Sequence, residues 1–220
     1  VTSRAFVDWK RVAFGFFSWG ILSAVIILVG IYSEPELYDW NFKPIPFFTL
    51  LVISLFFLPL QTSTEEVLFR GYFMQGLGLL VNNRWFPLLM TSVIFGLLHM
   101  ANPEIDKIGN IALVFYIGTG LFFGIATLMD DGLELALGLH ASNNIVAAFL
   151  VTTDWTVFQT DALFIDKSEP SVSLLMFLPV FVLYPVMLFW FSKKYNWKNW
   201  KEKLFGAVEK PNLIDENEFS

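Results

Sequence analysis

Three short motifs place ionisable and amide side chains inside otherwise apolar stretches of the chain. The first is EEVLFR, residues 65–70; the second is FGLLH, residues 95–99; the third is HASNN, residues 140–144. Charged groups at membrane depth cost about 2.5–3.5 kcal/mol each on insertion scales, so they persist where they are paired and used. We therefore expect the three motifs to converge on one functional site.

The first motif contains two adjacent carboxylates and an arginine. On a helix, Glu66 and Arg70 are four residues apart and share a face, whereas Glu65 is rotated away by about 100°. This spacing predicts that Arg70 holds Glu66 and that Glu65 is free to do chemistry.

A proline and a polar run precede this motif. Pro59 cannot continue the hydrogen-bond ladder of a helix, and residues 61–64 (QTST) offer N-cap side chains. We therefore expect a helix that is kinked or broken at Pro59 and restarts at Ser63 or Thr64. The two glutamates would then lie in a first turn, where the helix dipole favours negative charge.

The other two motifs each pair a histidine with a residue one helical turn away. Phe95 shares a face with His99, and His140 shares a face with Asn144. One carboxylate, two imidazoles and a carboxamide are enough for hydrolysis. The glutamate takes a proton from water, and an imidazole orients that water or protonates the leaving amine. Histidine and asparagine donors can also stabilise an oxyanion.

The same side chains could instead bind a metal ion. Glu65, His99 and His140 supply one oxygen and two nitrogens, the ligand set of a catalytic zinc with an open fourth position. The chain contains no cysteine, which excludes disulfides and cysteine ligands. The residues alone leave both mechanisms open.

Several of these residues also have purely structural interpretations. A single buried histidine can be a packing residue, and Phe95 is one of 25 phenylalanines. Asn143 lies three residues from His140 and is a rival to Asn144. Glu134, close to the edge of its apolar run, suits an interfacial position better than a catalytic one. Both histidines and the Glu-Glu pair occur in apolar runs, and this joint occurrence favours a functional site over purely structural roles.

The composition is that of a polytopic membrane protein. Of 220 residues, 55% are apolar and 15% are charged, with a mean hydropathy of +0.59, whereas a soluble domain carries about 25% charged residues. We expect an all-α transmembrane helical bundle of about six to seven membrane helices. The helices would be formed by residues 12–32, 46–81, 85–101, 111–129, 133–151 and 171–191. Gly118, Gly120 and Gly124 favour close helix packing in the fourth of these runs.

The distribution of charge predicts how the bundle lies in the membrane. Residues 46–81, counted as one kinked element, bring the total to six crossings, which puts both termini on one side. Basic residues flank the termini, whereas the loops at 33–44 and 152–170 are acidic. The positive-inside rule then places both termini in the cytoplasm. Asp130 and Asp131 on that side are a mild misfit.

We expect one transmembrane domain over residues 1–208, with a catalytic core at about 46–152 and a disordered acidic tail at 209–220. The expected partners are the lipid bilayer and a membrane-associated peptide or protein substrate, with no nucleic acid. The sequence does not determine the oligomeric state.

In order and in context, the three motifs resemble those of the CPBP family of intramembrane proteases. EEVLFR matches E-E-x-x-x-R, FGLLH matches F-x-x-x-H, and HASNN matches H-x-x-x-N. The family includes the type II CAAX prenyl endopeptidases and the bacteriocin-processing and abortive-infection-like proteases of bacteria. The resemblance implies an all-helical intramembrane endopeptidase.

The resemblance also implies roles for individual residues. Glu65 would be the general base, and His99 would help to activate the water. His140 and Asn144 would stabilise the oxyanion. The supporting residues of the motifs would be Glu66, Arg70 and Phe95.

The cofactor and the substrate are less closely constrained. CPBP proteases are often described as metal-dependent, yet a metal-free glutamate mechanism fits the same side chains. We expect a glutamate-activated water and keep a divalent metal, zinc first, as the alternative. The substrate could be a prenylated CAAX-type protein, a leader peptide, a bacteriocin precursor or a membrane-bound regulator. The expected location is a bacterial cytoplasmic membrane.

Two other classes of function fit a polar cluster in a membrane bundle. One is a non-catalytic adaptor or immunity protein, although binding alone does not require six costly polar groups. The other is a small proton-coupled transporter, although the chain lacks the internal repeat that many transporters show. Replacement of Glu65 by Gln should abolish proteolysis but leave an adaptor unaffected.

Overall fold

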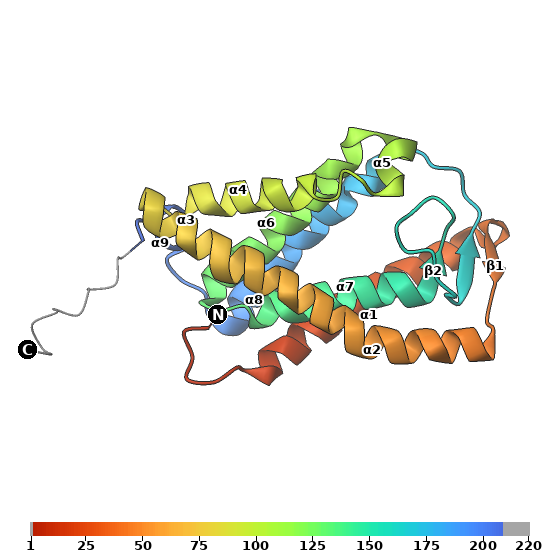
Figure 1. Cartoon of the computed structure of the whole chain (residues 1–220), viewed down its shortest axis with the longest axis horizontal. Helices are drawn as coiled ribbons and strands as arrows, with labels where there is room; N and C mark the ends of the chain where they lie inside the picture. Colours follow the sequence, from red (N-terminus) through yellow and green to blue (C-terminus); the bar gives the residue numbers. More distant parts are fainter. Residues whose placement is uncertain (1, 209–220) are drawn as a thin grey trace, which may run out of the picture.

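The computed structural model describes residues 2–208, which form a bundle of long helices (Figure 1). The predicted all-α membrane bundle is confirmed. The α-helices are α1 (Trp9–Ser33), α2 (Pro44–Glu66), α3 (Met74–Val81), α4 (Trp85–Leu97), α5 (Pro103–Ile108), α6 (Leu113–Asp130), α7 (Glu134–Leu150), α8 (Tyr184–Tyr195) and α9 (Trp200–Phe205). Shorter 3-10 and π segments are η1 (Pro35–Leu37), η2 (Val67–Phe73), η3 (Asn110–Ala112), η4 (Leu174–Phe177) and η5 (Pro179–Leu183). The acidic tail predicted at 209–220 lies outside the described residues.

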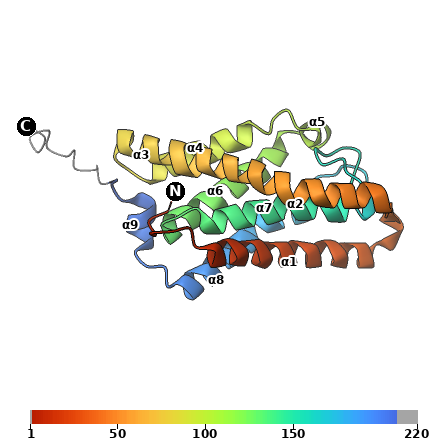
Figure 2. The same cartoon turned by 60° about the horizontal axis from the view of Figure 1, so that its bottom comes forward.

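Among residues 2–208, four helical stretches are long and apolar enough to cross a membrane. They are Trp9–Ser33, Pro44–Val81, Asn110–Asp130 and Leu174–Tyr195. The shorter helices α4 and α7 run beside them in both views of the bundle (Figures 1 and 2). The protein is therefore an integral membrane protein, and the count of six crossings stays a prediction.

The first motif lies in one continuous helical stretch, not at the start of a new helix. Pro59 is inside α2, which runs unbroken to Glu66 and continues through η2 into α3. The predicted break and restart are therefore wrong, although Figure 1 shows the ribbon changing direction within α2. The hydroxyls of Thr62 and Thr64 donate to the carbonyls of Leu58 and Leu60 instead of capping a new helix.

The departure from α geometry comes after the glutamates. Residues 67–73 form a π-helix, in which the backbone bonds span one residue more than in an α-helix. Such segments are rare and are frequently found at functional sites. Here the π segment contains Arg70 and directly follows Glu66. The glutamates therefore lie at the end of α2, so a first-turn dipole cannot favour their charge.

Glycines let the helices that carry the motifs approach their neighbours closely. A Cβ on Gly138 of α7 would lie 2.6 Å from the backbone nitrogen of Phe16, and one on Gly15 of α1 would lie 2.6 Å from the carbonyl of Leu135. Gly120 of α6 meets Ser92 of α4 in the same way, with its Cβ position 3.0 Å from the Cα of Ser92. The prediction of close packing along α6 is confirmed.

A small sheet, not predicted from the sequence, joins the two long acidic loops. Its strands are β1 (Tyr38–Trp40), β2 (Val151–Thr152) and β3 (Phe164–Asp166), in the order β1-β3-β2. β1 pairs antiparallel with β3, and β2 pairs parallel with it. Strands this short carry no readable two-residue alternation, so only the tertiary structure shows them.

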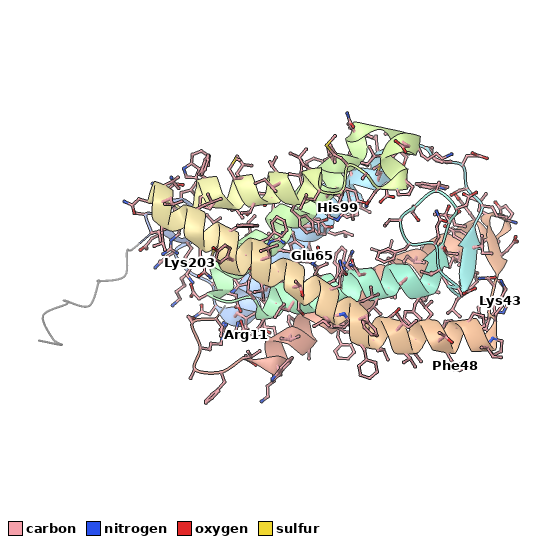
Figure 3. The ribbon with its side chains drawn as sticks, viewed as in Figure 1. Arg11, Lys43, Phe48, Glu65, His99 and Lys203 are labelled. Atoms are coloured by element: carbon pink, nitrogen blue, oxygen red, sulfur yellow. The ribbon has the colours of Figure 1, made fainter. Side chains whose placement is uncertain are left out.

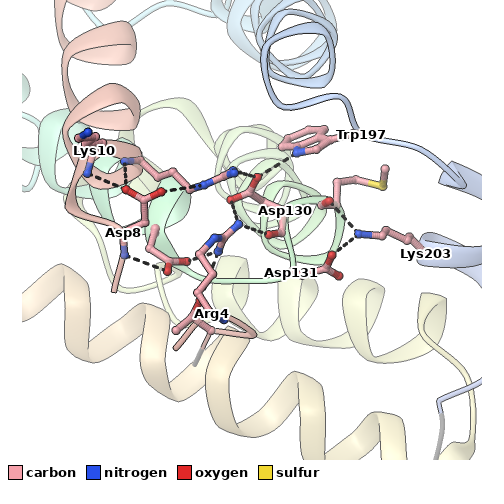
Figure 4. A network of polar contacts seen from close by, with 11 residues as sticks. Arg4, Asp8, Lys10, Asp130, Asp131, Trp197 and Lys203 are labelled. Atoms are coloured by element: carbon pink, nitrogen blue, oxygen red, sulfur yellow. Dashed lines mark hydrogen bonds and ion pairs between the residues drawn. The ribbon is translucent and has the colours of Figure 1, made fainter. Parts of the chain in front are cut away.

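At the opposite end of the bundle, a network of charges ties the N-terminal segment and the C-terminal helix to the α6–α7 turn (Figure 4). Asp130 accepts hydrogen bonds from Arg4 at 3.0 Å, from Arg11 and from the indole of Trp197 at 3.0 Å. Glu134 is buried and pairs with Arg4 at 2.9 Å in this terminal network, outside the three motifs, and its interfacial position stays a prediction.

Candidate active site

Glu66 and Arg70 form an ion pair inside the bundle. The Arg70 Nη1 donates to Glu66 Oε1 at 3.0 Å, and the two residues are 1% and 0% exposed. The predicted partnership of these two side chains is present. Burial of an ion pair costs several kcal/mol of desolvation for each ion, so such a pair is weak evidence for stability by itself.

Arg70 is fixed from several directions. Its Nη2 donates to the backbone carbonyl of Gly120 on α6 at 3.0 Å. Its guanidinium also lies over the ring of Phe95, 4.7 Å from the centroid, where the negative face of the ring attracts a cation. Arg70 thus connects the first motif with α6 and with the second motif on α4.

His140 is the second partner of Glu66. Its Nδ1 lies 2.7 Å from Glu66 Oε1, and the residue is 4% exposed. An ionised carboxylate only accepts hydrogen bonds, so Nδ1 carries a proton and donates it. This leaves Nε2 as the atom of the ring that can take or give a proton during a reaction.

Glu65 lies on the other side of that imidazole and is more accessible. Its Oε2 is 3.8 Å from His140 Nε2, and its side chain is 29% exposed. Gln61, one helical turn earlier, donates to Glu65 Oε1. A single water molecule could contact both the carboxylate and the imidazole across this distance, which is longer than a direct hydrogen bond.

The structure distinguishes Asn144 from its rival Asn143. The Asn143 Oδ1 accepts from the indole of Trp19 on α1 at 3.1 Å, so this side chain is used between helices. The Asn144 Nδ2 contacts Gln61 Oε1 at 3.5 Å and so lies on the side of Glu65. Gln61 therefore links the first motif with the third, a role that the sequence interpretation missed because it treated this residue as a cap.

His99 lies in the turn after α4, and not within a helix as predicted. The backbone nitrogen of His99 donates to the carbonyl of Gly96 at 3.0 Å. This bond spans three residues, whereas an α-helical bond spans four. Its Nδ1 lies 2.7 Å from the carbonyl of Phe95, which can only accept, so Nδ1 carries the proton and Nε2 is the acceptor. Figure 3 shows His99 and Glu65 at a similar level along the bundle, between the charged ends marked by Lys203 and Lys43.

Phe95 is the residue that joins the histidines. Its ring centroid lies 4.8 Å from that of His99 and 5.9 Å from that of His140. It also receives the guanidinium of Arg70, as described above. The side chains of all three motifs thus form one contiguous cluster, built from α2, η2, α4 with its following turn, and α7.

The zinc ligand set considered from the sequence was Glu65, His99 and His140. In the described part of the chain, no group of three or more histidine, aspartate or glutamate side chains is placed to hold a metal ion. The side chains as arranged here therefore do not fit that ligand set, and the mechanism below is derived from the protein groups alone.

Comparison with known proteins supports the predicted resemblance. Residues 44–146 match a family model described as type II CAAX prenyl endopeptidase Rce1-like. The chain is also 29% identical over 197 residues to the uncharacterized protein YyaK of Bacillus subtilis (strain 168). That alignment covers 88% of this chain and 66% of the relative, so the chain spans slightly less than two thirds of the relative's length. No solved structure matches the chain.

The matched segment begins at the first residue of α2 and ends inside α7. It therefore contains every residue of the cluster described above, from Gln61 to Asn144. The Rce1-like proteins are a protease family. Residues 44–146 of this integral membrane protein, the segment that carries the cluster, are thus similar to the Rce1-like type II CAAX prenyl endopeptidase family.

Proposed function

We propose that this protein is an intramembrane endopeptidase that hydrolyses a peptide bond of a membrane-associated substrate with a water activated by Glu65. One observation carries the proposal. The accessible Glu65 carboxylate faces the Nε2 of His140 across 3.8 Å, while the buried Glu66–Arg70 pair holds the other nitrogen of that ring.

In this mechanism, Glu65 takes a proton from a water molecule as the water attacks the carbonyl carbon of the peptide bond. The Nε2 of His99 is a hydrogen-bond acceptor, because its Nδ1 donates to the Phe95 carbonyl. His99 therefore helps to orient the same water. The proton held by Glu65 is then available for the leaving amine.

The attack converts the peptide carbonyl oxygen into an oxyanion. His140, when protonated at Nε2, and the amide of Asn144 donate hydrogen bonds to that oxygen. Glu66 compensates the positive charge that His140 then carries, since it contacts Nδ1 at 2.7 Å. Arg70 in turn keeps Glu66 charged and oriented.

The substrate is proposed to be a membrane-associated peptide or protein, either prenylated and CAAX-type or a leader-type peptide. The proposed location is a bacterial cytoplasmic membrane with both termini cytoplasmic. This orientation is supported by the basic termini and the acidic loops at 33–44 and 152–170. The catalytic core is proposed to span about residues 46–152.

The test is cleavage of membrane-anchored peptides by purified protein in liposomes, for wild type, Glu65→Gln and the matched control Glu36→Gln. Glu36 is exposed in η1, outside the bundle. Glu65→Gln keeps an acceptor for Gln61 but cannot take a proton, so cleavage should fall at least about 100-fold. Glu36→Gln should cleave as wild type does.

Each arm is repeated with a strong chelator and then with added zinc. Loss of wild-type cleavage on chelation, restored by zinc, would replace the metal-free mechanism by a metal-dependent one. Cleavage by Glu65→Gln at the wild-type rate would overturn the assignment of the base. Absence of cleavage by folded wild type across a broad peptide set would favour the non-catalytic adaptor.

A further inference from the structure

A cluster of polar side chains outside the three motifs holds the imidazole of His99. We propose that Tyr116, anchored by Glu104 and Asn102, is a positioning residue for His99. The inference deepens the proposed function, because it rests on His99 as the residue that orients the attacking water.

The ring of His99 is held mainly by its contacts with other side chains and with one carbonyl. α4 ends at Leu97, so His99 lies in a turn where no regular helical bonding restrains it. Tyr116 of α6 stacks on its imidazole, with centroids 4.2 Å apart and planes inclined by 21°. The carbonyl of Phe95 accepts a hydrogen bond from Nδ1 at 2.7 Å. The stacked phenol therefore defines the plane of the imidazole, and the carbonyl defines its tautomer.

The phenol of Tyr116 is itself fixed by hydrogen bonds. It donates to Glu104 Oε1 and accepts from Asn102 Nδ2 at 3.0 Å. Asn102 Nδ2 also lies 3.2 Å from Glu104 Oε1. Glu104 is only 8% exposed, and hydrogen bonds to a shielded carboxylate are stronger than those between neutral groups. The three side chains thus hold the aromatic ring in one position.

The same carboxylate also holds the loop between β2 and β3. The second oxygen of Glu104 accepts a hydrogen bond from the backbone N–H of Val157 at 3.1 Å. The turn after α4 is tied in as well, because the backbone N–H of Asn102 donates to the carbonyl of His99 at 3.0 Å. Glu104 therefore fixes the acidic loop and the support of His99 together.

A purely structural role predicts loss of stability without any specific effect on His99. The chain contains two histidines, His99 and His140, which allows the two roles to be separated. Labelling histidine with ¹⁵N yields ring signals from these two residues alone, and a His99→Ala sample assigns them. The ring nitrogen shifts report which nitrogen carries the proton and do not depend on enzymatic activity.

The variants are Tyr116→Phe, which keeps the stacked ring but removes its hydroxyl, and Glu104→Gln, which keeps the shape but removes the charge. The control is Tyr32→Phe, because Tyr32 is 89% exposed at the end of α1. We expect both test variants to shift the ring signals of His99 and to leave those of His140 in place. The control should alter neither.

Cleavage by each test variant should fall about 10- to 100-fold, because small displacements of catalytic groups cause losses of this size. The effect should appear in kcat, with KM changed less than about twofold. In a His99→Ala background, Tyr116→Phe should cost no more than about a further twofold, because the two residues act as one unit.

The inference is overturned if the His99 signals are unchanged in both test variants. It is also overturned if Tyr116→Phe lowers cleavage in the His99→Ala background by as large a factor as it does in the wild type. A general unfolding of Tyr116→Phe would move the signals of both histidines, and Glu104→Gln then decides the question. If folded wild type cleaves no peptide, the proposed function fails, while the ring signals still decide whether Tyr116 positions His99.

Discussion

At the scale of single residues, the site depends on one carboxylate that is charged, buried and shared. Glu66 Oε1 accepts from both Arg70 and His140, whereas Glu66 Oε2 is buried without a hydrogen-bond partner in the described residues. A buried acceptor without a partner costs free energy that an apolar side chain would not. The arrangement therefore makes sense as a means of orienting the imidazole of His140 and not as a source of stability.

The two neighbouring asparagines provide a residue-scale prediction. Asn144→Ala removes a proposed oxyanion donor, so kcat should fall about 100-fold while the melting temperature changes little. Asn143→Ala instead removes the partner of the Trp19 indole, which should lower the melting temperature and cost cleavage less than tenfold. Thermal unfolding and peptide cleavage of the two purified variants check this. Equal losses of cleavage would contradict the choice of Asn144.

At the scale of elements, the position of His140 depends on how closely α7 packs against α1. Gly138 lies two residues before His140, and a Cβ at this position would meet the backbone of Val12 and Phe16. On the opposite side of the contact, Gly15 faces the backbone of Leu135. A helix pair that packs backbone to backbone cannot accept a side chain at this point, since neither backbone can move away cheaply.

Substitution of Gly138 by Ala tests this packing. The added methyl should push α7 away from α1 and lower the free energy of unfolding by about 1–3 kcal/mol, the usual effect of overpacking. The control is Gly76→Ala on α3, where a Cβ meets nothing within 4 Å. The control should be neutral or stabilising by up to about 1 kcal/mol, because alanine is the better helix former. Thermal unfolding in detergent measures both, and a stable Gly138→Ala variant would contradict the packing argument.

At the scale of the whole molecule, the basic side chains that predict the membrane orientation also form ion pairs, which hold one end of the bundle together. Arg4 and Arg11 pair with Asp130, and Lys203 pairs with Asp131. The two acids that misfit the predicted topology are therefore neutralised by the basic segments at the same end. The segment before α1 and helix α9 are joined through the α6–α7 turn, immediately before the helix that carries His140.

Two aspartates in different surroundings test the role of these ion pairs. Asp130→Asn removes the carboxylate that Arg4 and Arg11 share, at a site where the aspartate is 4% exposed. The arginines keep Glu134 and Asp8 as partners, so the free energy of unfolding should fall by about 1–3 kcal/mol. Asp39→Asn removes a pair with Lys167 in which both side chains are about half exposed (60% and 46%), so it should cost less than about 1 kcal/mol. The difference in melting temperature between the variants measures the effect. Equal melting temperatures would show that the network does not hold this end of the bundle together.

The sequence by itself determined the membrane class, the positions of the long helices and the three motifs, because runs of apolar residues and one-turn spacings are local properties. The pairing of Glu66 with Arg70 was predictable for the same reason, since both residues lie on one helix. The predicted break at Pro59 was wrong because the helix continues past the proline, with nearby threonine hydroxyls bonded to the preceding turn.

Only the tertiary structure decided which residues from different helices meet. The shared carboxylate of Glu66, the link through Gln61 to Asn144, and the stacking of Tyr116 on His99 join residues up to 83 positions apart. No periodicity in the chain encodes such contacts. They follow from close backbone approach between helices, where glycines on α1, α6 and α7 let the polar faces come together.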